Sequence, residues 1–182
     1  NEMFSCTGLR KVHLEIATLG PLDILHCIWY PDPEFDLPIF GADIVANNNN
    51  VSAAITDVSP VDSINHPVYD DIADISRFFS FDNNRDVPSW GNIFSPYCKF
   101  ASLRTDEERT TFCHVVDQYL DVYAGAVWKS NRDNYGADLR YEGQMQYCKN
   151  QKLNDKTRRI LAKYFGDEWA DNYINQILFD EP

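Results

Sequence analysis

Residues 21–45, "PLDILHCIWYPDPEFDLPIFGADIV", place two polar side chains inside otherwise apolar segments. His26 lies in a run in which apolar residues dominate, and Asp43 directly precedes two aliphatic residues. Alternation with a period of two is typical of half-buried strands. A polar group that loses water on folding costs free energy unless a partner satisfies it. His26 and Asp43 are therefore candidates for a site on a sheet, although a single buried histidine is more often a satisfied core residue.

The first third of the chain is predicted to form antiparallel strands. Residues 9–20 alternate so that His13 and Glu15 share a face, and in residues 23–30 His26 shares a face with two isoleucines. Residues 42–46 and 51–57 flank the asparagine run 47–50, and asparagine tolerates the left-handed backbone of tight turns. These segments are predicted to pair as a hairpin. The polar face of such a sheet needs a polar or planar group against it.

The rest of the chain is predicted to be mainly helical. Helices are expected over 66–79, from Thr105 to about 128, over 155–165 and over 167–178, and a further strand over 97–103. Thr105 and Glu108 match a capping box, and Gly166 is a natural helix terminator. Strands followed by helices predict a single α+β domain in which helices cover an antiparallel sheet.

Composition excludes several classes of function. The net charge is −12, which disfavours general binding to nucleic acid or to anionic membranes. No apolar run is long enough for a membrane span, and the first residues lack the pattern of a signal peptide. The five cysteines are scattered without a CxxC pair, which indicates neither a zinc ribbon nor a disulfide framework and favours a reducing, cytoplasm-like compartment.

The ionisable residues of the predicted strands suit proton transfer. Histidine has an ordinary pKa near ~6.5, and a carboxylate neighbour together with burial moves it across the physiological range. If His26 and Asp43 touch, they can share a proton and titrate as a coupled pair, with Glu15 as a third acid nearby. The same region allows a metal site instead, since His13, Glu15 and His26 resemble a facial triad of two histidines and one carboxylate.

Six segments together resemble the ferredoxin-dependent bilin reductases: "RKVHLEIATLG", "LDILHCIWYP", "DLPIFGADIVA", "VSAAITDVSPV", "WGNIFSPYC" and "NDKTRRILAKYFGDEWADNYINQILFD". The resemblance covers nearly the whole chain in order. It implies a three-layer α/β/α sandwich with a central antiparallel sheet, formed by one bilin reductase domain over residues 1–182. It also implies that the family fold has a further N-terminal portion before residue 1.

The resemblance further implies an oxidoreductase that reduces biliverdin IXα to a phycobilin. Ferredoxin of the [2Fe–2S] type would supply four electrons one at a time, bilin radicals would form in between, and no metal or organic cofactor would be bound. The enzyme would act as a monomer in the cytoplasm of a cyanobacterium or of a phage-infected host cell. The product stays open: Glu15 favours phycocyanobilin, whereas the short chain favours phycoerythrobilin made through 15,16-dihydrobiliverdin.

The catalytic residues implied by the resemblance are four. His26 and Asp43 fall on the family's central proton-donating pair. Glu15 falls on the carboxylate that serves reduction of the D-ring vinyl group. Asp155 falls on a position where an acid donates protons in other members.

The substrate-binding residues implied by the resemblance are five. His13 falls on a second histidine that organises water and hydrogen bonds. Ser52, Arg85 and Lys156 match residues that hold the two propionates, and Asn154 lies near the bilin. Two alternatives remain: a bilin-binding protein without turnover, and a non-haem metal oxygenase that uses the triad above.

Overall fold

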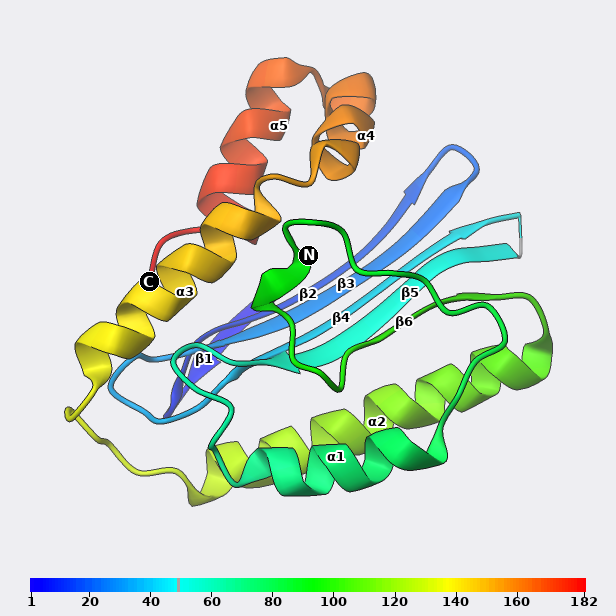
Figure 1. Cartoon of the computed structure of the whole chain (residues 1–182). Coiled ribbons are helices and arrows are strands. Elements are labelled where there is room, and N and C mark those ends of the chain that lie inside the picture. The colour runs from blue at the N-terminus through cyan, green and yellow to red at the C-terminus, as the bar shows by residue number, and fades with distance from the viewer. Residues whose placement is uncertain (49) are drawn as a thin grey trace.

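The computed structural model describes residues 1–48 and 50–182 and contains one six-stranded antiparallel sheet. The strands follow one another in space as they do in sequence (Figure 1), from β1 to β6. Their bounds are β1 Glu2–Cys6, β2 Leu9–Leu19, β3 Leu22–Pro31, β4 Ile39–Asn47, β5 Asn50–Ser59 and β6 Lys99–Leu103. The predicted hairpin is β4–β5, in which Asn47 pairs with Asn50, while residue 49 of the predicted turn lies outside the described residues.

Helices cover both faces of the sheet. They are α1 Val68–Phe78, α2 Asp106–Lys129, α3 Ala137–Gln151, α4 Asp155–Phe165 and α5 Asp167–Tyr173, with a 3₁₀ turn Gly91–Ile93 and a π-helical turn Ile174–Leu178. Helices α1 and α2 lie against one face, and α3, α4 and α5 against the other (Figure 1). The predicted three-layer α/β/α sandwich is confirmed. No helix in the described part of the chain has the length and apolar character needed to cross a membrane.

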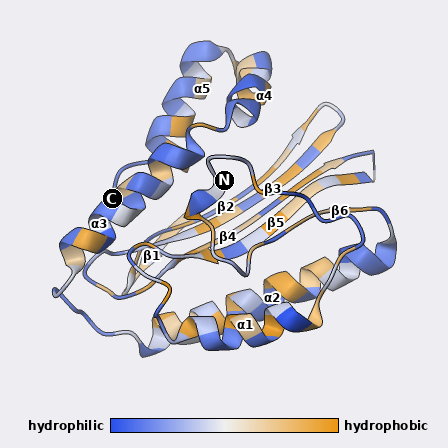
Figure 2. Ribbon diagram, in the orientation of Figure 1, coloured by the Kyte–Doolittle hydropathy of each residue, from blue (hydrophilic) through white to orange (hydrophobic). Residues whose placement is uncertain are grey.

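Strand alternation divides the core into two clusters, as the period of two predicts. In β3, Trp29 packs with the cluster under α1 and α2, whereas Ile28 and Tyr30 belong to the cluster under α3 and α5. The first cluster includes Phe40, Ala54, Val58, Ile72, Phe112 and Tyr119. Figure 2 shows more apolar residues on α1 and α2 than on α4 and α5, so the two layers cover the sheet differently.

Helix ends follow local chemistry. The backbone N–H of Glu108 donates to Thr105 Oγ1 at 3.1 Å, and the backbone N–H of Thr105 donates to Glu108 Oε2 at 3.2 Å, which confirms the capping box at the start of α2. Gly166 ends α4 with φ 91°, a backbone conformation that side chains disfavour. The helix expected over 167–178 is α-helical only to Tyr173 and continues as the π-helical turn.

Two elements lay outside the sequence prediction. Strand β1 is an exposed edge strand of five residues, so it shows no alternation of burial. Helix α3 buries Arg140, Gln144 and Asn150 beside Tyr147, and these polar residues conceal the apolar period of a helix. At Gly143 a Cβ atom would lie 1.4 Å from the Val61 carbonyl oxygen, so only glycine permits α3 to pack this closely.

Candidate active site

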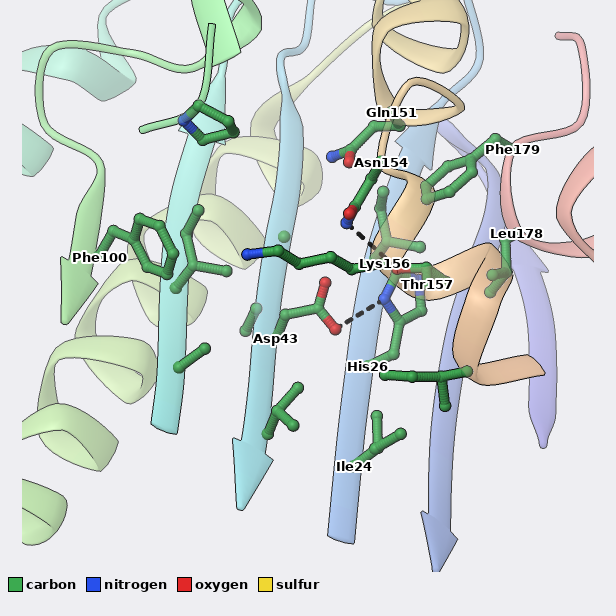
Figure 3. A pocket seen from close by; sticks show the side chains of 18 of the residues that line it. Ile24, His26, Asp43, Phe100, Gln151, Asn154, Lys156, Thr157, Leu178 and Phe179 are labelled. Atoms are coloured by element: carbon green, nitrogen blue, oxygen red, sulfur yellow. Dashed lines mark hydrogen bonds and ion pairs between the residues drawn. The ribbon is translucent and has the colours of Figure 1, made fainter. Parts of the chain in front are cut away.

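A cavity of about 840 Å³ lies between the sheet and the layer of α3, α4 and the C-terminal segment. Its floor comes from strands β2 to β5, and its roof from the end of α3, the first turns of α4 and residues 178–179 (Figure 3). This volume falls within the range of ~300–1,000 Å³ typical of small-molecule sites. Apolar side chains such as Ile24, Ile55 and Phe94 make up much of the lining, with charged groups at a few points.

Three polar side chains form one row across the floor. Antiparallel register places Glu15 on β2 opposite His26 on β3, and His26 opposite Asp43 on β4. Opposed residues of neighbouring antiparallel strands lie on the same face of the sheet, so all three side chains face the cavity that they line. The sheet thus assembles residues that are up to 28 positions apart in the chain.

His26 and Asp43 touch: His26 Nδ1 lies 3.0 Å from Asp43 Oδ1 (Figure 3). Burial lowers the pKa of His26, but the charge of Asp43 and its hydrogen bond raise it more, so the pKa is raised above its ordinary value. His26 Nε2 is buried without a hydrogen-bond partner among residues 1–48 and 50–182. The imidazole therefore holds a proton more firmly than usual, and its Nε2 makes no hydrogen bond within the described chain.

His13 lies beside His26, but its pKa is shifted in the opposite direction. The two ring centroids are 5.5 Å apart, and His13 is fully buried. Burial, together with the charges of His26 and Lys11, lowers the pKa of His13 to about 4. His13 Nε2 lies 2.8 Å from Asn1 Oδ1, and its Nδ1 has no partner in the described part of the chain. His13 is thus the neutral imidazole of the pair.

Glu15 is held by a residue that sequence reasoning missed. The Tyr173 hydroxyl lies 2.6 Å from Glu15 Oε2 and 2.8 Å from Asn1 Oδ1. Tyr173 is the last residue of α5, lines the cavity and is 9% exposed. Its separation from Glu15 by 158 positions leaves no local signal for this contact.

The far side of the cavity carries cations. Arg85 Nη1 donates to the Ser52 carbonyl oxygen at 2.7 Å, and its guanidinium lies 4.6 Å from the centroid of the Phe100 ring. Lys156 extends from α4 over the strands toward β5 (Figure 3). The structure therefore brings Ser52, Arg85 and Lys156 to the lining of one cavity, although Ser52 Oγ itself donates to the Val45 carbonyl oxygen at 3.2 Å.

Asn154 and Asp155 lie at the start of α4 and also contribute to the lining. Asn154 Nδ2 donates to Thr157 Oγ1 at 3.1 Å (Figure 3). The Asp155 carboxylate pairs with Arg159 at 3.2 Å and is 73% exposed. Asp155 thus lies at the rim of the cavity, where its carboxylate pairs with the exposed Arg159 and does not point to the floor.

Comparison with known proteins identifies the family to which this chain belongs. The sequence model of one family, described as ferredoxin-dependent bilin reductase, matches residues 1–180. The chain belongs to the ferredoxin-dependent bilin reductases. Like the family, it is an oxidoreductase.

Sequence relatives agree with the family assignment, and a solved structure agrees with the fold. Phycocyanobilin:ferredoxin oxidoreductase of Synechococcus sp. (strain CC9902) is 48% identical over 187 residues, covering 100% of this chain and 76% of the relative. The protein of the same name from Gloeobacter violaceus is 44% identical over 188 residues, covering 100% and 74%. A crystal structure of phytochromobilin synthase from tomato in complex with biliverdin has a TM-score of 0.79 at 18% identity, over 97% of this chain and 67% of that chain, and it supports the fold.

The metal-triad interpretation of this bilin reductase finds no geometric support. The Glu15 carboxylate contacts the Tyr173 hydroxyl, and His26 Nδ1 contacts Asp43. Within residues 1–48 and 50–182, no group of three histidine, cysteine, aspartate or glutamate side chains is arranged to hold a metal ion.

A buried carboxylate on β5 was not predicted. Asp57 lines the cavity and accepts from Ser59 Oγ at 2.6 Å, from the Ser95 N–H at 2.8 Å and from Ser95 Oγ at 2.5 Å. Burial raises the pKa of Asp57, although these hydrogen bonds act in the opposite direction. Through Ser95, it fixes the segment that carries Trp90 and Phe94 on the cavity wall. An aspartate inside an apolar strand was the available signal, the same one that singled out Asp43.

The C-terminal segment is fastened to the sheet by a second unpredicted group. Lys11 Nζ donates to the Ile177 carbonyl oxygen at 2.7 Å and forms an ion pair with Asp180. The Tyr30 hydroxyl donates to the Leu178 carbonyl oxygen at 3.1 Å. These contacts hold the C-terminal residues over the floor, where the Phe179 ring lies edge-on to His26 at 6.3 Å.

Proposed function

We propose that this bilin reductase converts biliverdin IXα to a phycobilin, with reduced ferredoxin as the electron donor and with His26 and Asp43 as proton donors. The observation that carries the proposal is the contact of 3.0 Å between His26 Nδ1 and Asp43 Oδ1 on the floor of a cavity of about 840 Å³. Asp43 raises the pKa of His26, which favours the protonated imidazole, and Nε2 has no hydrogen-bond partner in the described chain. General acids need both the proton and this reach.

The electron and proton counts fit such a pair. Reduction of one double bond takes two electrons and two protons, and the whole sequence to a phycobilin takes four of each. Ferredoxin delivers electrons singly, so a bilin radical forms after each odd electron and is quenched by a proton and the next electron. His26 and Asp43 are joined by one hydrogen bond, and the pair would be reloaded with protons from water between steps. The apolar walls exclude bulk water from the radical stages.

Cations at the cavity lining suit the two propionates of biliverdin. Arg85 and Lys156 supply the charges, and pairs between a cationic donor and a carboxylate are stronger than neutral hydrogen bonds. We assign Ser52 a supporting part, because its carbonyl oxygen already orients Arg85. Asn154 lines the cavity and would contact the pigment. His13, in contrast, is fully buried behind the lining and would act through its neighbours His26 and Asn1. We assign Asp155 the smallest catalytic part, since its carboxylate pairs with Arg159.

Glu15 would deliver the proton for reduction of the D-ring vinyl group. A working Glu15 yields phycocyanobilin, whereas reduction of the 15,16 bridge yields phycoerythrobilin. We propose phycocyanobilin as the product, because Glu15 lies in the same cross-strand row as His26 and Asp43. The relatives that share 41–48% identity carry the name phycocyanobilin:ferredoxin oxidoreductase, which favours the same product.

Ferredoxin would dock on residues 149–163, at the end of α3 and along α4. This segment holds six lysine and arginine residues and one acidic residue in a chain of net charge −12. Arg158 is engaged with Asp167 and Asp171, whereas Lys149 and Lys163 are exposed. An acidic redox partner would be attracted here, directly over the cavity roof. Five unpaired cysteines fit a reducing compartment, so we place the reaction in the cytoplasm, with the enzyme as a monomer.

The test is anaerobic incubation of the protein with biliverdin, ferredoxin and a ferredoxin-reducing system, followed by chromatography of the pigments. Phycocyanobilin is the expected product. Formation of phycoerythrobilin would contradict the proposed product but not the proposed reductase function. Biliverdin that binds but returns unreduced would identify a bilin-binding protein without turnover. Reduction that stops when a chelator removes metal would favour the oxygenase-like alternative and contradict the proposal.

A further inference from the structure

We propose that Tyr173 is a positioning residue for Glu15, and that its hydroxyl decides whether the Glu15-dependent reduction occurs. The inference rests on the function proposed above. It adds a residue outside the set of His26, Asp43 and Glu15, drawn from the other side of the cavity.

The place of the Tyr173 hydroxyl is fixed independently of Glu15. The Tyr173 ring stacks on Trp169 with centroids 4.7 Å apart and planes at 14°, and Trp169 in turn packs on Phe165 at 4.4 Å. These three aromatic rings come from the end of α4 and from α5, so the helical layer positions the hydroxyl. Glu15 comes from β2 on the opposite side of the cavity. The contact of 2.6 Å therefore joins the roof to the floor.

The hydroxyl is placed to donate to the carboxylate that remains when Glu15 gives up its proton. When a neutral Glu15 transfers its proton to the reduced pigment, the new bond is to pigment carbon and the oxygen–proton bond of Glu15 breaks. The electrons come from ferredoxin, and Tyr173 is neither oxidised nor reduced. The carboxylate left behind is stabilised by the donated O–H, because a hydrogen bond to an ionised acceptor in a poorly solvated site is strong.

Tyr173 keeps its own proton throughout. Burial raises the pKa of Tyr173 well above its ordinary value, and the hydrogen bond and charge of Glu15 raise it further. Its single O–H has two acceptors within reach, Glu15 Oε2 at 2.6 Å and Asn1 Oδ1 at 2.8 Å, and neither of them belongs to His26 or Asp43. Loss of the hydroxyl should therefore slow the step that uses Glu15 and leave the steps that use the His26–Asp43 pair.

The experiment compares Tyr173→Phe with Tyr123→Phe. Tyr123 is a matched control, because it is buried and its hydroxyl donates to the Pro38 carbonyl oxygen at 2.8 Å in the other helical layer. Loss of one hydrogen bond to a charged group corresponds to roughly 10- to 100-fold in rate. We expect Tyr173→Phe to bind biliverdin with unchanged affinity, to slow D-ring reduction by this factor and to accumulate a pigment with an intact D-ring vinyl group. Tyr123→Phe should give the wild-type pigment ratio.

A double-mutant cycle with Glu15→Gln separates positioning from a general structural effect. If Tyr173 acts through Glu15, Tyr173→Phe should change neither rate nor products further in the Glu15→Gln background. Independent, multiplying effects would overturn the inference, as would an unchanged pigment ratio in Tyr173→Phe.

A second variant covers the case in which Tyr173→Phe does not fold. Trp169→Leu keeps the hydroxyl but removes the ring that fixes it, and it should shift the pigment ratio in the same direction by a smaller factor. No shift in this variant would overturn the inference. A wild-type protein that reduces nothing would refute the proposed function itself, whereas reduction by all variants with equal products would refute only the role of Tyr173.

Discussion

The two helical layers of this molecule meet the same sheet in different ways. Under α2, Phe112, Val115, Tyr119 and Tyr123 are fully buried and fill the space above the sheet. Under α3, α4 and the C-terminal segment, a cavity of about 840 Å³ remains, with His26 and Asp43 on its floor. Successive residues of a strand point to opposite faces, so each strand serves both layers. One face of the sheet therefore carries a closed core, and the other carries the cavity with the candidate site.

The helices α2 and α4, one from each layer, also differ in charge. Helix α2 begins with three acidic residues, Asp106, Glu107 and Glu108, whereas α4 carries Lys156, Arg158, Arg159 and Lys163. The acidic layer covers the closed core, and the basic helix lies at the roof of the cavity. Substitutions confined to one layer test whether the two layers have separate roles.

The largest effect is expected on the cavity side, from Asp43→Asn. The amide keeps the size of the side chain but removes the charge that raises the pKa of His26. Because general acid–base catalysis contributes about 10²- to 10⁴-fold, turnover should fall by a factor in that range while biliverdin stays bound and a radical accumulates. Single-turnover absorption and electron paramagnetic resonance would measure both. Asp74→Asn, at an exposed ion pair on α1, is the control, and wild-type turnover by Asp43→Asn would contradict the assignment.

The largest effect on the closed side should come from Phe112→Ala. This ring is fully buried beneath α2 and packs against Phe81 at 5.6 Å between centroids. Removal of a buried phenylalanine costs about 3–5 kcal/mol in the free energy of unfolding. Denaturant unfolding should show this loss, while turnover per folded molecule stays at the wild-type value. A fall in turnover of the folded fraction would mean that the two layers are coupled.

The sequence predicted the fold where its pattern was local. The capping box at Thr105, the terminator Gly166 and the alternation along β3 each arise from neighbours in the chain, and the structure confirms them. Helix α3 escaped prediction because Arg140, Gln144 and Asn150 occupy its buried face. These buried polar groups form hydrogen bonds with residues that are distant in the sequence. Arg140, for example, donates to the Pro33 carbonyl oxygen.

The candidate site was predictable only in part, for the same reason. Alternation indicated that His26 and Asp43 occupy strands, but their pairing depends on the register between β3 and β4, which no local pattern specifies. The resemblance to the family supplied the remaining residues, and their roles stay predictions. Tyr173 and Lys11 act through contacts with distant segments and gave no local signal. Asp57 did give a signal, as a lone acid between Thr56 and Val58 in an apolar strand.

A smaller effect is expected from the contrast in charge, with Lys163→Glu on α4 and Lys129→Glu on α2. Both lysines are exposed, and both substitutions change the net charge equally. If ferredoxin docks on residues 149–163, Lys163→Glu should raise the KM for ferredoxin several-fold at low ionic strength, and salt should erase the difference. Lys129→Glu should leave this KM nearly unchanged. Equal effects of the two variants would show that overall charge, and not a local surface, governs docking.

The smallest effect is expected within the site, where the two histidines should give opposite pH dependence of stability. The pKa of His26 is raised from 6.5, so its contribution to stability is complete below pH ~6.5 and is lost as pH rises through the folded-state pKa. The pKa of His13 is lowered to about 4, so this residue lowers stability as pH falls from ~6.5 toward 4. Chemical unfolding should be measured from acid to alkaline pH. The wild type should be more stable than His26→Gln at low pH, and this difference in the free energy of unfolding should shrink as the pH becomes alkaline. Relative to His13→Gln, the wild type should instead lose stability at acid pH. Parallel curves for the two variants would mean that His26 and His13 share one electrostatic environment, and that the contact of 3.0 Å with Asp43 does not hold a proton on His26.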